Sequence, residues 1–426
     1  MNSFLRNEDE NVKDLLDRAM NIGEQMLLSG AEVHRVEDSL YRIMESFGAE
    51  RTDVFIITSS MIVTVHTKDG DVITQTRRIT SAGTDFQKLH KLNDLSRKIC
   101  YKHMTTDEID RELENIRTVK SYPFWLEVLS YAIIAGAFTL FFGGTWLDAA
   151  LSFAIGALAR VLILISDRTV KNKIFTNFTA SFASAGAAYL LYNYGVIPDV
   201  DEIIIGNIMT LIPGIGITNA LRDLFTGDSI AGLLRTVESI LNALAIAAGY
   251  FVLVLVMGDV GVVAAVSVPN EFLQIITGAV GTLGFAFLFN IRGKKLISVA
   301  IGGLLSWTLH LLVFHLTGSE VIGYIVSAGA MSVFADIMAR VHKSPTTTFT
   351  IPTLVPLIPG GSLYKTMRYA LTGDTALFFE TGLNTLKLAA ALALGIILVS
   401  VLTKPIMRYL NIKTHRRKML EKHIGK

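Results

Sequence analysis

The chain is poor in cysteine and in net charge. One cysteine, Cys100, among 426 residues excludes a secreted scaffold stapled by several disulfide bonds. A net charge of +2 gives no reason to expect nucleic-acid binding. The sequence also has no Walker A loop, nucleophile elbow or zinc-binding helix motif, which argues against an ATP-driven pump and a membrane-bound hydrolase. We therefore expect no enzyme activity, no metal and no cofactor.

The charged residues are unevenly distributed along the chain. Residues 1–120 contain 17 Lys or Arg and 21 Asp or Glu, which is half of all the charged residues. Residues 121–426 hold the other half at a much lower density, and the mean hydropathy of the chain is +0.47. An apolar region of this length is typical of a membrane protein. The first 13 residues show no apolar core of a signal peptide, so we expect residues 1–120 to stay in the cytoplasm.

The hydrophobic pattern of residues 1–120 changes from helical to strand-like and back. Apolar residues at steps of three and four predict amphipathic helices over 15–28 and 33–47. β-Branched runs between 54 and 78, interrupted by an Asp-Gly pair, predict strands and a hairpin. Helices follow over about 84–101 and from Thr105, where Glu108 completes a capping box. Residues 1–120 are thus predicted to form a small soluble α+β domain.

The rest of the chain contains ten apolar stretches, and most of them reach the roughly 20 residues that a bilayer requires. They lie near 124–142, 145–166, 174–194, 203–220, 230–257, 272–290, 295–316, 321–341, 350–364 and 375–402. Lys and Arg concentrate in alternate connections and in the C-terminal tail, as expected for cytoplasmic loops. The chain is predicted to be a polytopic α-helical membrane protein of the inner membrane, with ten transmembrane helices and both termini in the cytoplasm.

An internal repeat divides the membrane region. Residues 211–214 (LIPG) match 357–360 at an offset of 146, and residues 226–228 (TGD) match 372–374 at the same offset. Each half contains five spans, an odd number, so the halves have opposite orientations. The prediction is a 5+5 inverted repeat, with a first half over 121–260 and a second half over 261–426. Inverted repeats recur in secondary transporters.

The predicted substrate site lies in spans four and nine, which proline and glycine interrupt. Proline removes a backbone donor, and glycine lets the chain leave helical geometry. The amino ends of the resulting half-helices suit a substrate carboxylate, and exposed carbonyl groups suit its ammonium. Kinks that only shape the bundle are the alternative. The candidate binding residues are Asn207, Pro213, Gly214, Gly216, Asn219, Pro359, Gly360, Gly361 and Tyr364.

Charged side chains beside these spans are candidates for gating and for proton coupling. Arg222 and its counterpart Arg368 are expected to pair alternately with Asp228 and Asp374. Glu238 is the first candidate for a proton carrier, because burial would raise its pKa. An ion pair between Arg235 and Glu238, one turn apart on span five, is a purely structural alternative. The full set is Arg222, Asp223, Asp228, Arg235, Glu238, Arg368 and Asp374.

Three segments resemble the threonine/serine exporter family (ThrE type). They begin with LLSGAEVHRVEDSLYRI at residue 27, LRDLFTGD at residue 221 and LVPLIPGGSLYKTMRYALTGD at residue 354. In the N-terminal domain the matching motif positions are Glu32, Arg35 and Glu37.

The resemblance implies an exporter of L-threonine and L-serine driven by the proton motive force. Its partners would be a small amino acid, a proton and the lipid bilayer. In the second half, Tyr369 and Asn384 replace the counterparts of Asp223 and Glu238, so proton coupling is expected to rest on the first half. Some family members are split into two subunits linked to dicarboxylate export, so a dicarboxylate exporter stays open. A passive channel, a membrane-anchored sensor or enzyme, and a homo-oligomer also stay open.

Overall fold

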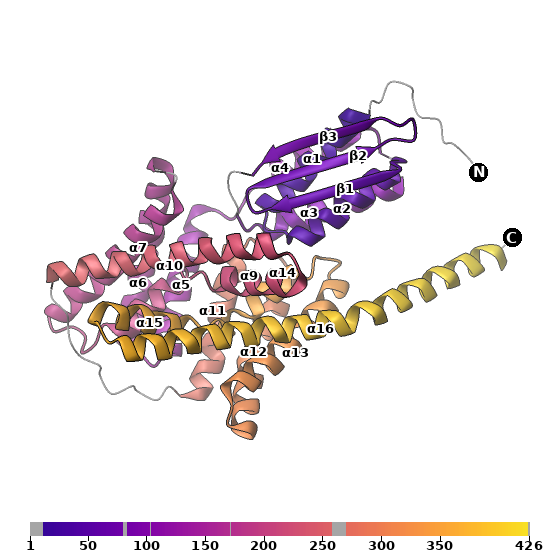
Figure 1. Cartoon of the computed structure of the whole chain (residues 1–426). Coiled ribbons are helices and arrows are strands. Elements are labelled where there is room, and N and C mark those ends of the chain that lie inside the picture. Colours follow the sequence, from indigo (N-terminus) through magenta and orange to yellow (C-terminus); the bar gives the residue numbers. More distant parts are fainter. Residues whose placement is uncertain (1–11, 80–82, 103, 171, 258–269, 425–426) are drawn as a thin grey trace.

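The computed structural model describes residues 12–424 except 80–82, 103, 171 and 258–269 (Figure 1). In this part of the chain, four helices and a three-stranded sheet form a layered unit at the N-terminus, which we call the head (residues 12–117). Figure 1 shows the head to one side of the other helices. The predicted boundary at residue 120 falls in the connection that follows the head, whereas the boundary at 260 lies outside the described residues.

The head is a sheet covered by helices. The antiparallel strands lie in the order β1-β2-β3, and the predicted Asp-Gly turn joins β2 to β3 with Gly70 at a φ of 89°. In β2, Met61, Val63 and Val65 are fully buried because alternate side chains face the helices. Its elements are α1 (Val12–Leu28), α2 (Val33–Ser46), β1 (Arg51–Ile57), β2 (Ser60–His66), β3 (Val72–Arg78), α3 (Phe86–Lys102) and α4 (Thr106–Arg117).

The remainder of the described chain is helical. Its elements are α5 (Phe124–Phe141), α6 (Trp146–Thr169), α7 (Lys173–Asn193), α8 (Asp201–Ile208), α9 (Gly214–Thr226), α10 (Ser229–Met257), α11 (Glu271–Leu288), α12 (Lys295–Thr317), α13 (Glu320–Val341), α14 (Thr347–Thr353), η1 (Val355–Leu357), α15 (Gly360–Thr372) and α16 (Thr375–Ile424). Among the described residues, seven helices are long and apolar enough to cross a membrane: α5, α6, α10, α11, α12, α13 and the first part of α16. The chain is thus a mostly helical membrane protein.

Helix α5 lies at the centre of the bundle, against α6, α8 and α11. Glycines on α11 permit the close approach of α5. A Cβ atom at Gly281 would lie 2.5 Å from the ring of Phe138, and one at Gly284 would lie 2.7 Å from Ile134. Small residues allow helices to pack closely inside a membrane, where lipid is as apolar as the side chains.

The helices before residues 258–269 and the helices after them pack on one another in the same order. Helix α5 packs on α6 as α11 packs on α12, and α7 packs on α10 as α13 packs on α16. Helix α9 contacts α16, and α15 contacts α10. Helices α9 and α15 have 13 residues each and end at glycines with positive φ, Gly227 at 99° and Gly373 at 78°. The interrupted segments therefore occupy matching places in the two series of helices.

Candidate functional site

Two helix breaks form the centre of the candidate site. Helix α8 ends at Ile208, and α9 begins after Pro213, which lies at the N-cap without a side-chain cap. The second break has the same form: η1 ends at Leu357, and α15 begins after Pro359, again without a side-chain cap. The first amides of a helix lack intrahelical acceptors and carry the positive end of the helix dipole. Each break therefore presents an amino end that suits an anion.

The two breaks lie against each other. A Cβ atom at Gly360 would lie 2.9 Å from Sδ of Met209 and 3.2 Å from Cδ1 of Ile212, both in the first break. A Cβ atom at Gly361 would lie 2.9 Å from the ring of Phe142. The start of α15 thus packs directly on side chains of the first break, and a larger residue at Gly360 would make the Met209 and Ile212 side chains move. The two breaks therefore meet at one junction, where Gly360 packs on Met209 and Ile212.

Hydroxyl groups flank this junction on both sides. A Cβ atom at Gly216 of α9 would lie 2.6 Å from the hydroxyl oxygen of Ser239 on α10. At the matching position of α15, the Ser362 hydroxyl oxygen accepts a hydrogen bond of 2.8 Å from Thr385 on α16. Ser362 and Thr385 had no place in the sequence-predicted site, because hydroxyl residues on apolar helices give no distinctive pattern. They add polar groups to the walls of the junction.

The predicted binding residues Asn207 and Asn219 are buried to different extents. Asn207 is buried on α8, where its Nδ2 donates to the hydroxyl oxygen of Ser152 at 2.7 Å and to the Ile203 carbonyl at 2.9 Å. Its Oδ1 has no hydrogen-bond partner among the described residues. Asn219 is partly buried on α9. Asn207 therefore joins α8 to α6 and keeps one acceptor uncommitted.

Tyr364 and Arg368 meet at one carboxylate, in what we call the Asp201 cluster (Asp201, Tyr364 and Arg368). The Tyr364 hydroxyl donates to Oδ1 of Asp201 at 2.7 Å, and Arg368 forms an ion pair with the other oxygen. The expected partner of Arg368, Asp374, instead accepts a hydrogen bond from the backbone of Leu377 at the start of α16. That pairing was therefore wrong: the start of α8 packs on α15 and brings Asp201 within reach.

The head-side cluster (Glu32, Arg222, Asp223 and Arg235) joins the head to α9 and α10. Nη1 of Arg222 lies 3.0 Å from Oε1 of Glu32, the residue just before α2. Nε of Arg235 lies 3.2 Å from Oδ2 of Asp223. The exposed fraction of these four side chains ranges from 11% to 27%. Motif residues of the head and of the first half thus meet in a largely dehydrated network.

This cluster corrects three expectations. Arg222 pairs with Glu32 rather than with Asp228. Arg235 pairs with Asp223 rather than with Glu238, because α9 packs along α10 and carries Asp223 to it. Glu238 lies on the outer surface of α10 rather than among the helices, so the packing that would bury it as a proton carrier is absent.

The charges of the cluster shift the pKa values of two carboxyl groups of the head. Burial by itself would raise the pKa of Glu32, but Arg222, Arg35 and Arg235 together hold it below its ordinary value. The pKa of Glu37 is raised, first by burial and then by the negative charge of Asp228. Glu32 is therefore the ionised partner in the cluster, and Glu37 the carboxyl group that binds a proton more readily.

A groove of about 860 Å³ lies between α3 of the head and the connection from α13 to α14. Charged groups of both signs line it, and the connection leads through α14 into the second break. The sequence gives no sign of this groove, because its two walls lie more than 200 residues apart in the chain. Its lining residues are His90, Asp94, Arg97, Asp336, Ala339, Arg340, His342, Lys343, Ser344 and Thr346.

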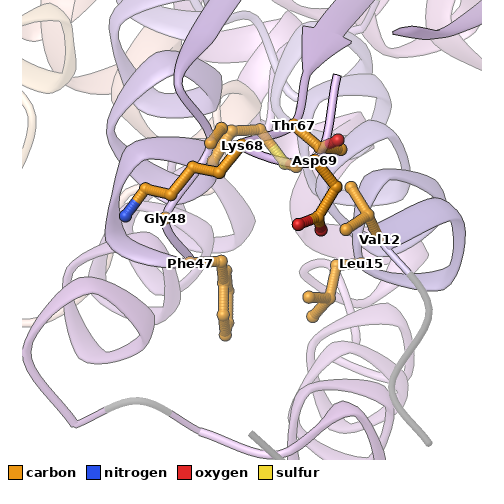
Figure 2. Close-up of a pocket in the computed structure, with 9 residues that line it drawn as sticks. Val12, Leu15, Phe47, Gly48, Thr67, Lys68 and Asp69 are labelled. Atoms are coloured by element: carbon orange, nitrogen blue, oxygen red, sulfur yellow. The ribbon is translucent and has the colours of Figure 1, made fainter. Parts of the chain in front are cut away.

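A smaller pocket of about 50 Å³ lies within the head (Figure 2). Figure 2 shows Phe47 and Leu15 on two sides of it and Lys68 and Asp69 at its rim. A buried water needs roughly 10–15 Å³ of such space, so the pocket has room for a few waters. It is separate from the helix breaks and from the head-side cluster.

Comparison with known proteins places this architecture in a family. A family model for threonine/serine exporters (ThrE) matches residues 17–257, more than half of the chain. The chain belongs to the threonine/serine exporter family. A second model, described as "Threonine/Serine exporter, ThrE", matches residues 274–402. The two matches cover the head with the first series of helices and the second series, respectively.

Individual members of the threonine/serine exporter family are distant in sequence. The chain is 22% identical to the "Threonine/serine exporter" of Corynebacterium glutamicum, over 91% of this chain and 82% of that protein. It is 23% identical to the "Probable threonine/serine exporter" of Mycobacterium tuberculosis, over 94% and 78%. The "Probable succinate transporter subunit YjjP" of Klebsiella aerogenes is 24% identical over 53% of this chain and 86% of its own length. No solved structure matches the chain.

Proposed function

We propose that this protein is a secondary active exporter of L-threonine and L-serine in the inner membrane, with the head and both termini in the cytoplasm. Its membership of the threonine/serine exporter family and the names of two relatives that align with most of the chain support the substrate class. The seven apolar helices support the membrane location.

We infer that ten helices span the membrane as a 5+5 inverted repeat. Helix α7 and the interrupted pairs α8–α9 and α14–α15 would complete the ten. The corresponding contacts of the two series support this arrangement. The repeat-related arginines also support it: Arg222 reaches the head, whereas Arg368 reaches Asp201, and Figure 1 places α15 farther from the head than α9. Such opposite placement is expected when one half is inverted with respect to the other.

The contact between the two breaks carries the proposal. Two helix amino ends without side-chain caps converge where Gly360 meets Met209 and Ile212. Such ends attract a carboxylate, and the backbone carbonyls freed by the breaks attract an ammonium. The hydroxyls of Ser362 and Thr385 add groups that match the hydroxyl of threonine or serine. The junction is thus chemically suited to a small hydroxylated amino acid.

We infer that Asp223, in place of Glu238, carries the proton. Asp223 is 8% exposed, whereas Glu238 is exposed. Arg235 stabilises the charged form of Asp223. When Asp223 binds a proton, it loses its charge and releases Arg235, so the pair has a closed state and an open state. Tyr369 stands at the corresponding position of the second half, so this carboxylate is present in one half alone.

The groove beside α14 is a suitable entrance for the substrate. Asp94 and Asp336 place negative charge in its walls, and Arg97, Arg340 and Lys343 place positive charge there. Asp94 and Arg97 form an ion pair with each other. This mixture of signs suits a zwitterion better than a dianion such as succinate.

Flux measurements in liposomes test the proposed function. Saturable, concentrative uptake of labelled L-threonine that depends on a pH gradient and stops with a protonophore supports it. Uptake of labelled succinate in place of threonine would favour a dicarboxylate exporter, which the name of the Klebsiella aerogenes relative makes the second candidate. Unsaturable flux without accumulation would indicate a channel, and no flux of either label would favour a sensor or enzyme.

A further inference from the structure

The head contacts both series of helices, but in different ways. At the connection between α11 and α12, Asn290 donates to both carboxylate oxygens of Asp85, and the Phe289 carbonyl accepts from the amide of Phe86. The rings of Phe86 and Phe289 pack edge to face with centroids 5.6 Å apart. This contact joins the head to the end of an unbroken helix. It provides an anchor of hydrogen bonds and apolar surface.

The second contact of the head reaches a segment that follows a helix break. Glu32 pairs with Arg222 near the carboxyl end of α9, and α9 is separated from α8 by the break at Pro213. Gly227 ends α9 in the left-handed region, with a φ of 99°. The break at one end of α9 and the glycine at its other end provide two points about which the helix is able to tilt. An ion pair there is able to open and close, unlike the packed anchor.

The repeat-related residues Arg368 and Arg222 pair with carboxylates from different parts of the chain. Arg368 of the second half takes its carboxylate from Asp201 of the first half. By the offset of 146, the matching carboxylate for Arg222 would come from residue 347, which is Thr347. Thr347 is 2% exposed, carries no charge, and its hydroxyl has no hydrogen-bond partner among the described residues. The second half thus offers Arg222 no equivalent of Asp201, and the head offers Glu32.

We propose that Glu32 is a positioning residue of the transport cycle, which holds the end of α9 closed and makes the head the inner gate. This inference rests on the proposed function for its orientation, with the head in the cytoplasm. Arg222 bound to Glu32 keeps the junction of the breaks shut toward the cytoplasm. Release of this pair lets α9 tilt and opens the site to the substrate, while the Asp201 cluster closes the other end.

A cysteine placed behind the gate tests this proposal. The chain has one cysteine, so the C100S variant is free of thiols and a single reporter is unambiguous. Asn219 lies three residues, or about one helical turn, before Arg222 on α9, deeper than the proposed gate. In the N219C/C100S background, a membrane-impermeant maleimide is added to the cytoplasmic side of membrane vesicles. The labelling rate is measured for E32Q, R222Q, E32R and the charge swap E32R/R222E.

We expect E32Q, R222Q and E32R to be labelled at least about tenfold faster than the parent. E32Q and R222Q leave one charge of a largely dehydrated pair without its partner, and E32R places two positive charges together. The swap E32R/R222E restores the slow rate if the ion pair itself holds the gate. D38N is the matched control, because Asp38 lies on the same helix as the head motif and pairs at the surface with Arg42. Labelling of E32Q and R222Q no faster than that of D38N overturns the proposal.

The charge swap distinguishes opening of the gate from misfolding as the cause of fast labelling. A swap that is labelled as slowly as the parent excludes misfolding as the cause of fast labelling in E32R, because the double variant carries the same two charges in exchanged places. The assay needs no transported substrate. Threonine flux is measured separately in the chain that keeps Asn219, because Asn219 is a candidate binding residue. A gate that responds to E32Q while the chain with Asn219 does not move threonine leaves the inference standing and rejects the proposed substrate.

Discussion

Nη1 of Arg222 and Oε1 of Glu32 lie 3.0 Å apart, although 190 positions separate them in the chain. One belongs to a helix that follows a break in the membrane region, and the other precedes the second helix of the head. Because the pair is withdrawn from most of the surrounding water, the loss of one partner leaves a poorly solvated charge and costs more than in an exposed pair.

The pH dependence of stability follows from this pair. The pKa of Glu32 in the folded protein lies below its ordinary value of 4.5. The contribution of the pair to stability is therefore fully present above about pH 4.5 and is lost as the pH falls through the lowered pKa. We expect E32Q to reduce Tm at pH 7 by roughly 2 °C or more, and the difference from the parent to shrink at acid pH. Thermal unfolding in detergent between pH 3 and 7 measures both.

D38N serves as the control for this measurement, because its pair with Arg42 is exposed and such pairs contribute little. A Tm difference between the parent and E32Q that stays constant down to pH 3 would show that Glu32 contributes through packing rather than through its charge.

Proton coupling is expected to depend on Asp223. D223N should abolish threonine flux driven by a pH gradient while it spares exchange of labelled for unlabelled threonine, because exchange needs no net proton movement. E238Q should retain gradient-driven flux, because Glu238 is exposed and Arg235 pairs with Asp223. Both fluxes are measured in proteoliposomes. Loss of coupling in E238Q with normal coupling in D223N would contradict the assignment.

We expect two substitutions in the Asp201 cluster to reduce threonine flux to different extents. Y364F removes one hydrogen bond of 2.7 Å to Asp201 and keeps the ion pair with Arg368. An ordinary hydrogen bond contributes about 1 kcal/mol, so a several-fold loss of threonine flux is expected. D201N removes the charge that faces Arg368 and should cost at least ten times more activity than Y364F. Y194F, at a tyrosine that is 82% exposed, is the control for loss of a hydroxyl. Equal effects of Y364F and D201N would argue against the ion pair.

The spacing between α9 and α10 should depend on Gly216. A Cβ atom there would lie 2.6 Å from the Ser239 hydroxyl oxygen, closer than any stable contact. G216A should therefore reduce threonine flux several-fold, because either the Ser239 hydroxyl must rotate away or α9 must move. G216A/S239A should recover part of it, because the second change removes the clashing atom. G186A is the matched control, since its Cβ would meet the nearest atom at an ordinary 3.5 Å. A double variant no better than G216A would place the defect elsewhere.

Local structure was readable from the sequence. The Asp-Gly turn between strands, the capping box at Thr105 and the helix breaks at Pro213 and Pro359 all lie where composition and spacing indicate. These features depend on neighbouring residues alone: a proline without an N–H group, a glycine with a free φ, or a hydroxyl beside the first amides of a helix. The family was also readable, because its motifs are contiguous segments.

Partnership between distant residues was decided by the tertiary structure. Arg222 and Arg368 were identified as paired residues of a repeat, yet their carboxylates, Glu32 and Asp201, lie in other elements and follow no spacing rule. Glu238 and Asp223 are equally charged in the sequence, and only the packing of α9 on α10 buries one and exposes the other. The sequence by itself determined where the helices stop and which residues carry charge. The packing of those helices determined which charges lose their water, because burial is a property of neighbours that the chain order does not record.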